Sequence, residues 1–497
     1  KPLPIHVVDT EVWRVLPTVI VGTLDKAAGI SVQANMRGMI AEPSGFCPRP
    51  GHGHTYATRA NRPHGCLVPD CNEPRGPLPM AKNRYAVGFR LQDELHLLRD
   101  SLGAVDAHYE ALYDDLQETL SGRRPKVLAS SATLSGYRRQ SDVLYGREAR
   151  IFPHPEPKAG QGFWAGDSPQ RMRRYLAIAP RGQTIEYALD RMIVSLQTAI
   201  RKVIAEPEKL AAEIGIDPRH LDLMIRLYGT DVIYGNTLRD LDAVVRSGET
   251  QWEDVPSPRP RVASLTGRTI FTDVIETLEE LETPKADFAE RTHVVVGSSM
   301  MSHGVDIDRL NVMVMLGLPL TTAEFIQATA RVGRTWPSLV FVVHKIARER
   351  DASVYRSFRQ FVDQGDRFVE PIPITGNSRR VLERTIAGLA FARILMLHEP
   401  RAGGSLALSR KVRDYLANVP DFETSEIDAI CTALRFDDES NPTLREEVQK
   451  WYHHLVSEVI DPANASAFAN SLGMYGGPMM SLRDVEEQVE VWGRDPS

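Results

Sequence analysis

The chain has 497 residues, of which 42% are hydrophobic and 25% charged, and its formal net charge is −6 at pH 7. These values fit a soluble globular protein of about two to four domains and argue against a protein that coats nucleic acid through net positive charge. The sequence has no run of about 18 apolar residues, so no membrane span is expected. Its four cysteines are too few for a disulfide scaffold, and they favour a reducing, cytoplasmic location.

The first 151 residues combine short apolar runs with a helical segment. Residues 16–28 predict a buried strand followed by a helix, and residues 85–98 predict a strand that ends in acids. Residues 126–134 predict a strand that ends in small hydroxyl residues, and the apolar spacing over 104–121 predicts a helix. We expect residues 1–151 to form the back part of one α/β lobe.

Residues 152–170 are rich in proline and glycine, which predicts a linker. Beyond it, strand-like runs alternate with helical segments over residues 171–345, a pattern typical of parallel βαβ units. From residue 346 to 497 we expect a helical C-terminal extension. The predicted strands are 175–179, 231–234, 262–265, 293–296, 312–316 and 339–343. The predicted fold class is α/β, with two parallel-sheet lobes, a helical C-terminal region and a small insert.

The insert, residues 43–80, is rich in Pro, Gly, His and Cys and shows no periodicity. Thiolates and imidazoles are the ligands of tetrahedral Zn²⁺, and a metal would supply folding energy that so few apolar residues cannot. The alternative is an irregular loop whose cysteines are coincidental. The candidate ligands are Cys47, His52, His54, His64, Cys66 and Cys71, and we expect the three cysteines and either His52 or His54 to bind the ion.

The sequence QDELH at residues 92–96 places two adjacent acids at the end of a predicted strand. In P-loop-type ATPases, the first acid of such a pair holds Mg²⁺ and the second orients the attacking water. Asp93 and Glu94 suit these roles, and the alternative is that the pair begins a solvated helix. Ser131 and Thr133 end the next predicted strand, where their hydroxyls can hydrogen-bond to the acids.

A second cluster of chemically suited residues precedes residue 335. Gly304 allows the backbone to approach a ligand closely, and Asp306 is suited to contact a hydroxyl or a cation. Gln327, Arg331 and Arg334 follow at a spacing that predicts one face of a helix. Two arginines there can neutralise charge on a transferring phosphoryl group, whereas the alternative is a pair of surface ion pairs.

In order and spacing, these segments resemble the motifs of superfamily 2 helicases in a DEAH-like form. QDELH resembles motif II, SAT motif III, GSSMMSHGVDI motif V and QATARVGR motif VI. VGTLDK resembles motif Ib, and YGNTLRD with LTG resembles motifs IV and IVa. The resemblance covers residues 16–345, and it implies two RecA-like lobes, ATP and Mg²⁺ as cofactors, and a nucleic acid as partner.

The resemblance also implies roles for individual residues. It implies catalytic roles for Asp93 (which would hold Mg²⁺), Glu94, His96, Gln327, Arg331 and Arg334; ATP contacts for Ser131, Thr133, Gly304 and Asp306; and nucleic-acid contacts for Thr23, Lys26, Asn236, Thr266, Gly267 and Ser298. Thr23 alone could equally cap a helix. The nucleic acid is expected to be duplex or single-stranded DNA, but contacts to the phosphate backbone do not separate DNA from RNA.

A narrower resemblance comes from the runs MSHGVDIDRLN and EFIQATARVGR. They are similar to bacterial helicases that act beside a DUF1998-type partner, in particular to the DrmA helicase subunits of DISARM antiphage defence systems. This implies a DNA translocase that acts with a protein partner. The alternatives are a non-catalytic, helicase-derived DNA clamp or scaffold and an RNA helicase.

One departure from the family pattern is the phosphate-binding loop. The sequence contains no G-x-x-x-x-G-K-[ST] and no Gly-Lys dipeptide. The family order places that loop before motif Ib, hence before Lys1, and Lys1 is not an initiator Met. We therefore expect the chain to begin inside a longer protein, and we do not expect these residues alone to hydrolyse ATP.

Overall fold

The structure, a computed structural model, divides into two compact units. Unit 1 comprises Lys1–Arg150 and Pro371–Ser497, and unit 2 comprises Ile151–Glu370. In the part of the chain that the structure describes, no helix is both long and apolar enough to cross a membrane. The described residues are 4–131, 135–152, 170–298, 306–406, 409–436, 441–460, 478–479 and 481–482.

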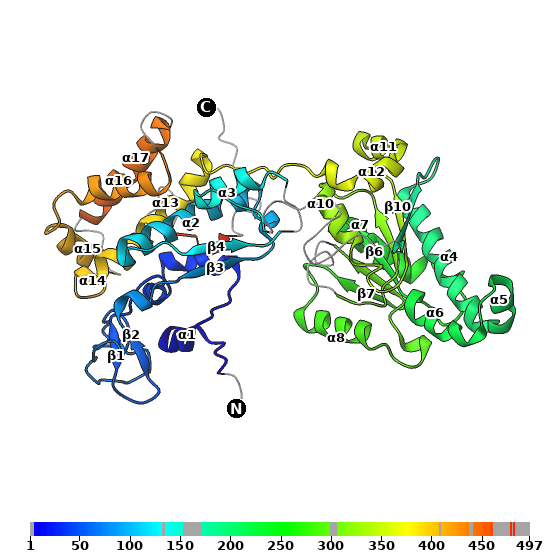
Figure 1. The fold of residues 1–497 in the computed structure, drawn as a ribbon, viewed down its shortest axis with the longest axis horizontal. Helices are drawn as coiled ribbons and strands as arrows, with labels where there is room; N and C mark the ends of the chain where they lie inside the picture. Colours follow the sequence, from blue (N-terminus) through cyan, green and yellow to red (C-terminus); the bar gives the residue numbers. More distant parts are fainter. Residues whose placement is uncertain are drawn as a thin grey trace. The chain divides into compact units, whose positions relative to one another are not determined.

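Unit 2 is built on a six-stranded sheet in the order β5-β10-β9-β6-β8-β7, in which all neighbouring strands are parallel (Figure 1). Strands β6, β8 and β9 are buried throughout, which explains why their sequences are nearly continuous apolar runs. Each of the six runs predicted from the sequence forms one of these strands. The strands are β5 (Arg173–Ile178), β6 (Asp231–Gly235), β7 (Val262–Leu265), β8 (Val294–Gly297), β9 (Val312–Leu316) and β10 (Ser338–Val343).

Helices cover both faces of this sheet. Ile233 and Val314 belong to one core with α4 and α7, whereas Val232 and Met313 belong to a second core with α8, α10 and α12. Successive side chains of a strand point to opposite faces, so a single strand supplies both cores. The helices are α4 (Ile185–Ala205), α5 (Pro207–Ile214), η5 (Pro218–His220), α6 (Leu221–Tyr228), α7 (Leu238–Thr250), α8 (Phe271–Glu282), η6 (Phe288–Glu290), α10 (Thr322–Thr329), α11 (Glu349–Arg356), α12 (Phe358–Asp363) and η7 (Gly365–Phe368).

Unit 1 contains two small sheets. Strands β3 and β4 form a parallel pair, and β1 and β2 form an antiparallel hairpin within the insert. Phe89, Leu91 and Leu128 of the β3–β4 pair are 51%, 64% and 47% exposed, so this pair does not supply a core by itself. The strands are β1 (Gly45–Cys47), β2 (Gly53–Thr55), β3 (Phe89–Gln92) and β4 (Lys126–Ala129).

The strand predicted at the start of residues 16–28 is wrong. Residues 16–23 are irregular and are followed by a 3-10 helix, η1, and Val19 and Val21 are 75% and 91% exposed. A strand requires a neighbour that accepts its ladder of hydrogen bonds, and within the described residues the β3–β4 sheet pairs only with itself. Apolar, β-branched composition is therefore not sufficient for a strand here.

The core of unit 1 is helical. Buried Tyr109 and Leu116 of α2 share one hydrophobic cluster with Ile386 of α13, Ile430 of α16 and Trp451 of α17. The helices are α1 (Asp9–Val15), η1 (Leu24–Ser31), η2 (Ala34–Met39), η3 (Lys82–Arg84), η4 (Leu95–Leu97), α2 (Asp100–Ser121), α3 (Tyr137–Tyr145), α13 (Arg379–Arg393), the π-helical η8 (Ile394–His398), α14 (Glu399–Arg401), α15 (Ser409–Leu416), α16 (Phe422–Ala433) and α17 (Pro442–Ile460).

This packing bears on the domain organisation. The sequence predicts a separate helical extension from residue 346, whereas the contacts join residues 346–370 to unit 2 and residues 371–497 to unit 1. The reason is the shared apolar face of α2, which α13 and α16 bury. The predicted subdivision into a first lobe, a linker, a second lobe and a helical extension stays a prediction. The two compact units share the region that was predicted to be the helical extension.

Buried charges join α2 to the C-terminal helices. The Arg393 side chain is 6% exposed, forms an ion pair with Asp115 of α2, and donates from Nε to Glu426 Oε2 of α16 at 2.6 Å. His398 Nε2 lies 3.0 Å from Glu426 Oε1. Burial alone would raise the pKa of Glu426, but the hydrogen bond with His398 and the charge of Arg393 lower it to about 2. Glu426 is thus ionised at neutral pH.

Replacing Arg393 tests this arrangement. In Arg393→Met, two carboxylates remain near the helix interface without their cation, so we expect a loss of about 3–5 kcal/mol in the free energy of unfolding of unit 1. The control is Arg124→Met, which breaks a half-exposed pair with Glu118 and should cost less than about 1 kcal/mol. Urea titrations followed by circular dichroism measure both, and equal losses would contradict the prediction.

Candidate functional site

The predicted acids follow strand β3, beside the end of β4. The register pairs Gln92 with Ala129, so the next residues, Asp93 and Ser130, leave the sheet at the same edge. The Ser130 hydroxyl donates a hydrogen bond to Asp93 Oδ1, and the Glu94 backbone N–H donates to the same oxygen at 3.0 Å. Parallel pairing thus brings the acids of the motif II segment to the hydroxyl of Ser130, the residue before the motif III segment.

His96 closes the same cluster. It is buried, and its Nδ1 lies 3.3 Å from Glu94 Oε2 and 3.5 Å from Ser131 Oγ. Glu94 has φ 52°, a left-handed backbone conformation that is uncommon and costly for a residue with a side chain. Of the predicted residues, His96 therefore contacts both Glu94 and Ser131.

The sequence analysis missed Ser130. The register of β3 and β4 could have identified Ser130. Gln92 pairs with Ala129, so Ser130 is the residue beside Asp93 once this pairing is known. Thr133, predicted from the same segment, lies outside the described residues.

In unit 2, the predicted arginines lie beyond the helix that was expected to carry them. Helix α10 ends at Thr329, so Gln327 is helical but Arg331 and Arg334 lie in the turn that follows, and the prediction of one helix face is wrong. Within this turn, Gly333 has φ 68°, and its position leaves no room for a side chain. A Cβ there would lie 2.3 Å from Ser338 Oγ.

The turn brings two predicted segments together. Arg334 forms an ion pair with Asp306, which joins the motif VI segment to the motif V segment. Arg173 of β5 donates to the carbonyl oxygens of Val332 and Ala330 at 2.8 and 3.4 Å and so holds the turn from the sheet side. Gly304, the remaining predicted residue of this cluster, lies outside the described residues.

The predicted nucleic-acid contacts of unit 2 share one edge of the sheet. Asn236 follows β6, Thr266 and Gly267 follow β7, and Ser298 follows β8, and these three strands are neighbours. The carboxyl ends of parallel strands meet at one edge, where open α/β sheets bind ligands. Two side chains are partly engaged there, because Asn236 Nδ2 donates to Leu318 O at 2.8 Å and Thr266 Oγ1 lies 3.4 Å from Thr269 Oγ1.

The remaining two predicted contacts lie in unit 1. Thr23 is exposed and precedes η1 without capping it through its side chain, so the helix-cap alternative is not realised. Lys26 is 65% exposed, and its Nζ lies 3.2 Å from Asp9 Oδ2. Both side chains face solvent, as a contact with a phosphate backbone requires.

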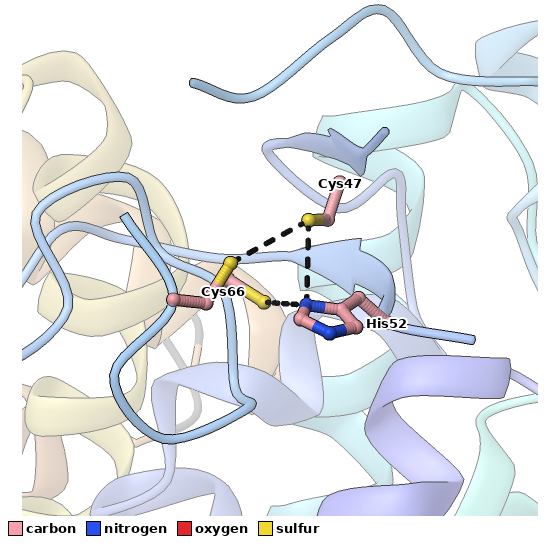
Figure 2. Close-up of side chains that lie close together, drawn as sticks. Cys47, His52 and Cys66 are labelled. Atoms are coloured by element: carbon pink, nitrogen blue, oxygen red, sulfur yellow. Dashed lines mark hydrogen bonds between the residues drawn. The ribbon is translucent and has the colours of Figure 1, made fainter. Parts of the chain in front are cut away.

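The Cys/His cluster of the insert gathers four of its predicted ligands. The ligand atoms of Cys47, His52, Cys66 and Cys71 all lie within 4.8 Å of one another. Figure 2 shows Cys47, His52 and Cys66 pointing toward one another. His54 is not part of this group, because its Nδ1 donates to Arg14 O at 2.9 Å and its Nε2 lies 3.2 Å from the Tyr85 hydroxyl.

Comparisons with known proteins bear on the predicted family. The family of the helicase conserved C-terminal domain matches residues 258–335. The chain is 29% identical over 480 residues to the DISARM protein DrmA of Bacillus paralicheniformis, an alignment that covers 92% of this chain and 40% of that protein. The resemblance predicted from the motifs is confirmed. The chain spans about two fifths of the length of this relative.

Similar solved structures include two DNA-bound helicases. The DUF1998 helicase MrfA bound to DNA is 16% identical with a TM-score of 0.43, over 63% of this chain and 36% of that one. The helicase Lhr of Mycobacterium smegmatis bound to single-stranded DNA and AMP-PNP is 13% identical with a TM-score of 0.43, over 66% of this chain and 40% of that one.

Substitution of Gly333 tests the arginine turn. Gly333→Ala places a Cβ against Ser338 Oγ and the Met172 carbonyl in a left-handed conformation, so we expect unit 2 to lose about 1–3 kcal/mol of stability. The control is Gly267→Ala, where a Cβ would meet no atom within 4 Å, and it should change stability by less than about 1 kcal/mol. Thermal unfolding measures both, and an unchanged midpoint for Gly333→Ala would contradict the prediction.

Proposed function

We propose that this chain is part of an ATP-dependent DNA helicase or translocase of superfamily 2 that acts in antiphage defence of the DISARM type. The observation that carries the proposal is the cluster of Asp93, Glu94, His96 and Ser131 at the carboxyl edge of β3 and β4. The phosphate-binding loop of such an enzyme is not in this sequence, so the activity belongs to a polypeptide that supplies it.

The proposal assigns Asp93 to Mg²⁺. Its side chain is exposed, and the two hydrogen bonds that it accepts from described residues both go to Oδ1. Mg²⁺ keeps several waters and takes one or two carboxylates together with phosphate oxygens, so a single exposed carboxylate at a strand end fits this ion. Bound Mg²⁺ supplies charge neutralisation on the nucleotide phosphates.

The proposal assigns Glu94 to water orientation and His96 to its support. Glu94 Oε2 lies 3.3 Å from His96 Nδ1, and the His96 ring is buried, so the ring restricts where the carboxylate can swing. Ser131 Oγ lies 3.5 Å from the same nitrogen, so a movement of the segment after β4 would shift His96 and, through it, Glu94. In this way the contacts with the nucleic-acid strand would change with the state of the nucleotide.

The proposal assigns Arg331 and Arg334 of unit 2 to the phosphoryl group in transfer. Guanidinium groups held by a rigid turn cost little reorganisation when they stabilise developing charge. The turn here is fixed by Gly333 and by the bonds from Arg173 to Val332 O and Ala330 O. Asp306 neutralises Arg334 in this structure, so it is placed to compete with the nucleotide for that arginine.

The nucleic acid would follow the edge that carries Asn236, Thr266, Gly267 and Ser298, together with Thr23 and Lys26 of unit 1. These residues offer hydroxyls, amides and one exposed cation, which suit contacts with phosphates rather than with bases. DNA is the proposed substrate because the motif segments resemble those of the DrmA helicases of DISARM systems, a resemblance that implies a DNA translocase. A DUF1998-type protein is the proposed partner, and ATP is the proposed nucleotide substrate.

The deciding experiment is ATP hydrolysis by the full-length protein, with and without DNA. We expect turnover that DNA raises, and a drop of at least about 100-fold in Glu94→Gln, because the group that orients water is lost. Glu118→Gln, a half-exposed glutamate on α2, is the control and should keep wild-type turnover. Turnover absent from the wild-type protein with DNA present would favour the alternative of a non-catalytic clamp, and stimulation by RNA alone would favour an RNA helicase.

A second experiment separates the arginine roles from surface ion pairing. Arg334→Ala should lower DNA-stimulated turnover by at least about 1,000-fold, the scale of a lost arginine that contacts the phosphoryl group. Arg191→Ala, on α4, removes a surface ion pair with Asp254 and serves as the matched control. If both variants hydrolyse ATP equally well, Arg334 makes only a surface ion pair.

A further inference from the structure

We infer that the insert binds one structural Zn²⁺ through the side chains of Cys47, His52, Cys66 and Cys71. This site is independent of the ATPase cluster and needs neither nucleotide nor nucleic acid. The metal would hold together a segment that fastens α1 to the C-terminal helices.

The separations between the four side chains match a tetrahedral zinc site. Zn–S bonds of about 2.3 Å and Zn–N bonds of about 2.0–2.1 Å place two sulfurs about 3.8 Å apart and a sulfur and a nitrogen about 3.5–3.6 Å apart. Cys47 Sγ lies 3.8 Å from Cys71 Sγ and 3.6 Å from His52 Nδ1, and Cys66 Sγ lies 3.5 Å from His52 Nδ1 (Figure 2). Three of the six separations among the donor atoms thus have the values of a tetrahedral zinc site, and all four atoms lie within 4.8 Å of one another.

A disulfide does not explain the cluster. The 3.8 Å between Cys47 and Cys71 is far above the roughly 2.05 Å of a disulfide bond, and all three thiols of the insert are free. Three thiols and an imidazole are also the donor set that soft, four-coordinate metals prefer. Their buried position, with Cys47, Cys66 and Cys71 at most 4% exposed, is typical of a closed structural site.

The hairpin explains how these ligands meet. Strands β1 and β2 pair Cys47 with Gly53, so Cys47 and His52 flank the same tight turn. Cys66 pairs with Thr55 of β2 in an isolated antiparallel bridge, which brings this cysteine back beside the hairpin. Cys71 follows after the next turn. Two three-residue strands are too short to hold such a loop by themselves, so the metal would be the cross-link that fixes it.

The insert fastens α1 directly beside the proposed ligand His52. Arg14 donates to the backbone oxygens of His52 and Gly51 at 3.1 and 2.7 Å. Gly53 has φ 82°, and a Cβ there would lie 2.2 Å from Arg14 O, so this loop approaches α1 as closely as the backbone permits. The Tyr56 hydroxyl adds a bond of 2.7 Å to Trp13 O.

A second contact joins the insert to the C-terminal region. Arg59 donates to buried Glu399 Oε1 of α14 at 3.1 Å, and the other oxygen of Glu399 accepts from the Leu406 N–H at 2.9 Å. Loss of the metal would therefore weaken contacts of α1 and of the segment after α14, as well as the structure of residues 43–80.

The test is metal analysis of the purified 497-residue chain by mass spectrometry, before and after dialysis against zinc and removal of unbound metal. We expect about one zinc per chain in the wild type. Cys66→Ser and His52→Ala should bind Zn²⁺ at least about tenfold more weakly. The matched controls are Cys431→Ser, a buried cysteine of α16 outside the cluster, and His54→Ala, the neighbouring histidine that is bonded elsewhere, and both should keep the metal.

A cobalt titration of the wild-type chain tests the inference without any variant. Co²⁺ bound by thiolates in a tetrahedral site gives visible absorption bands, and one equivalent should saturate them and should be displaced by Zn²⁺. Wild-type chain that binds no zinc and shows no such bands would overturn the inference. Retention of zinc by His52→Ala with loss in His54→Ala would overturn the proposed ligand set, and stoichiometric iron in place of zinc would overturn the proposed metal.

Discussion

The buried guanidinium of Arg393 is the interaction on which unit 1 depends. It pairs with Asp115 of α2, 278 positions earlier in the chain, and with Glu426 of α16. The apolar side of α2 shares one core with helices that follow unit 2 in the sequence, α13, α16 and α17, and with residues of α1 and η1. Because an unmatched buried charge is costly, the pairing selects one position of α13 and α16 against α2. Asp93, which follows β3, belongs to the same compact unit as these helices.

Much of the fold could be predicted because strands buried on both faces leave a direct signature. The runs that form β6, β8 and β9 are largely apolar and β-branched, and these inner strands are buried throughout. Residues 16–22 have the same composition but no partner among the described residues, so composition alone misled the prediction. The end of α10 at Thr329 was also not predicted, because the helical spacing of Gln327, Arg331 and Arg334 continues past it, whereas the turn that follows binds Arg173 through the carbonyl oxygens of Ala330 and Val332.

The candidate sites were predictable as residue types, whereas their partners came from the structure. QDELH identified the acids, but the bond from Ser130 to Asp93 depends on the register of β3 and β4. The sequence could not choose between His52 and His54 because both stand close to Cys47. The hairpin register pairs His54 with Phe46, which turns its ring toward Tyr85, while His52 stays in the turn beside the thiols.

The β3–β4 pair has a consequence for how the protein behaves in solution. Leu91 and Leu128 are more than 40% exposed, and within the described residues each strand has a single neighbour. Strands with unpaired edges and exposed apolar side chains can form backbone hydrogen bonds with extended segments of other molecules. Lys126, an exposed charge at the start of β4, is of the kind that discourages such stacking. At high concentration these 497 residues should therefore tend to aggregate through sheet edges, and detergent or a covering polypeptide should suppress it.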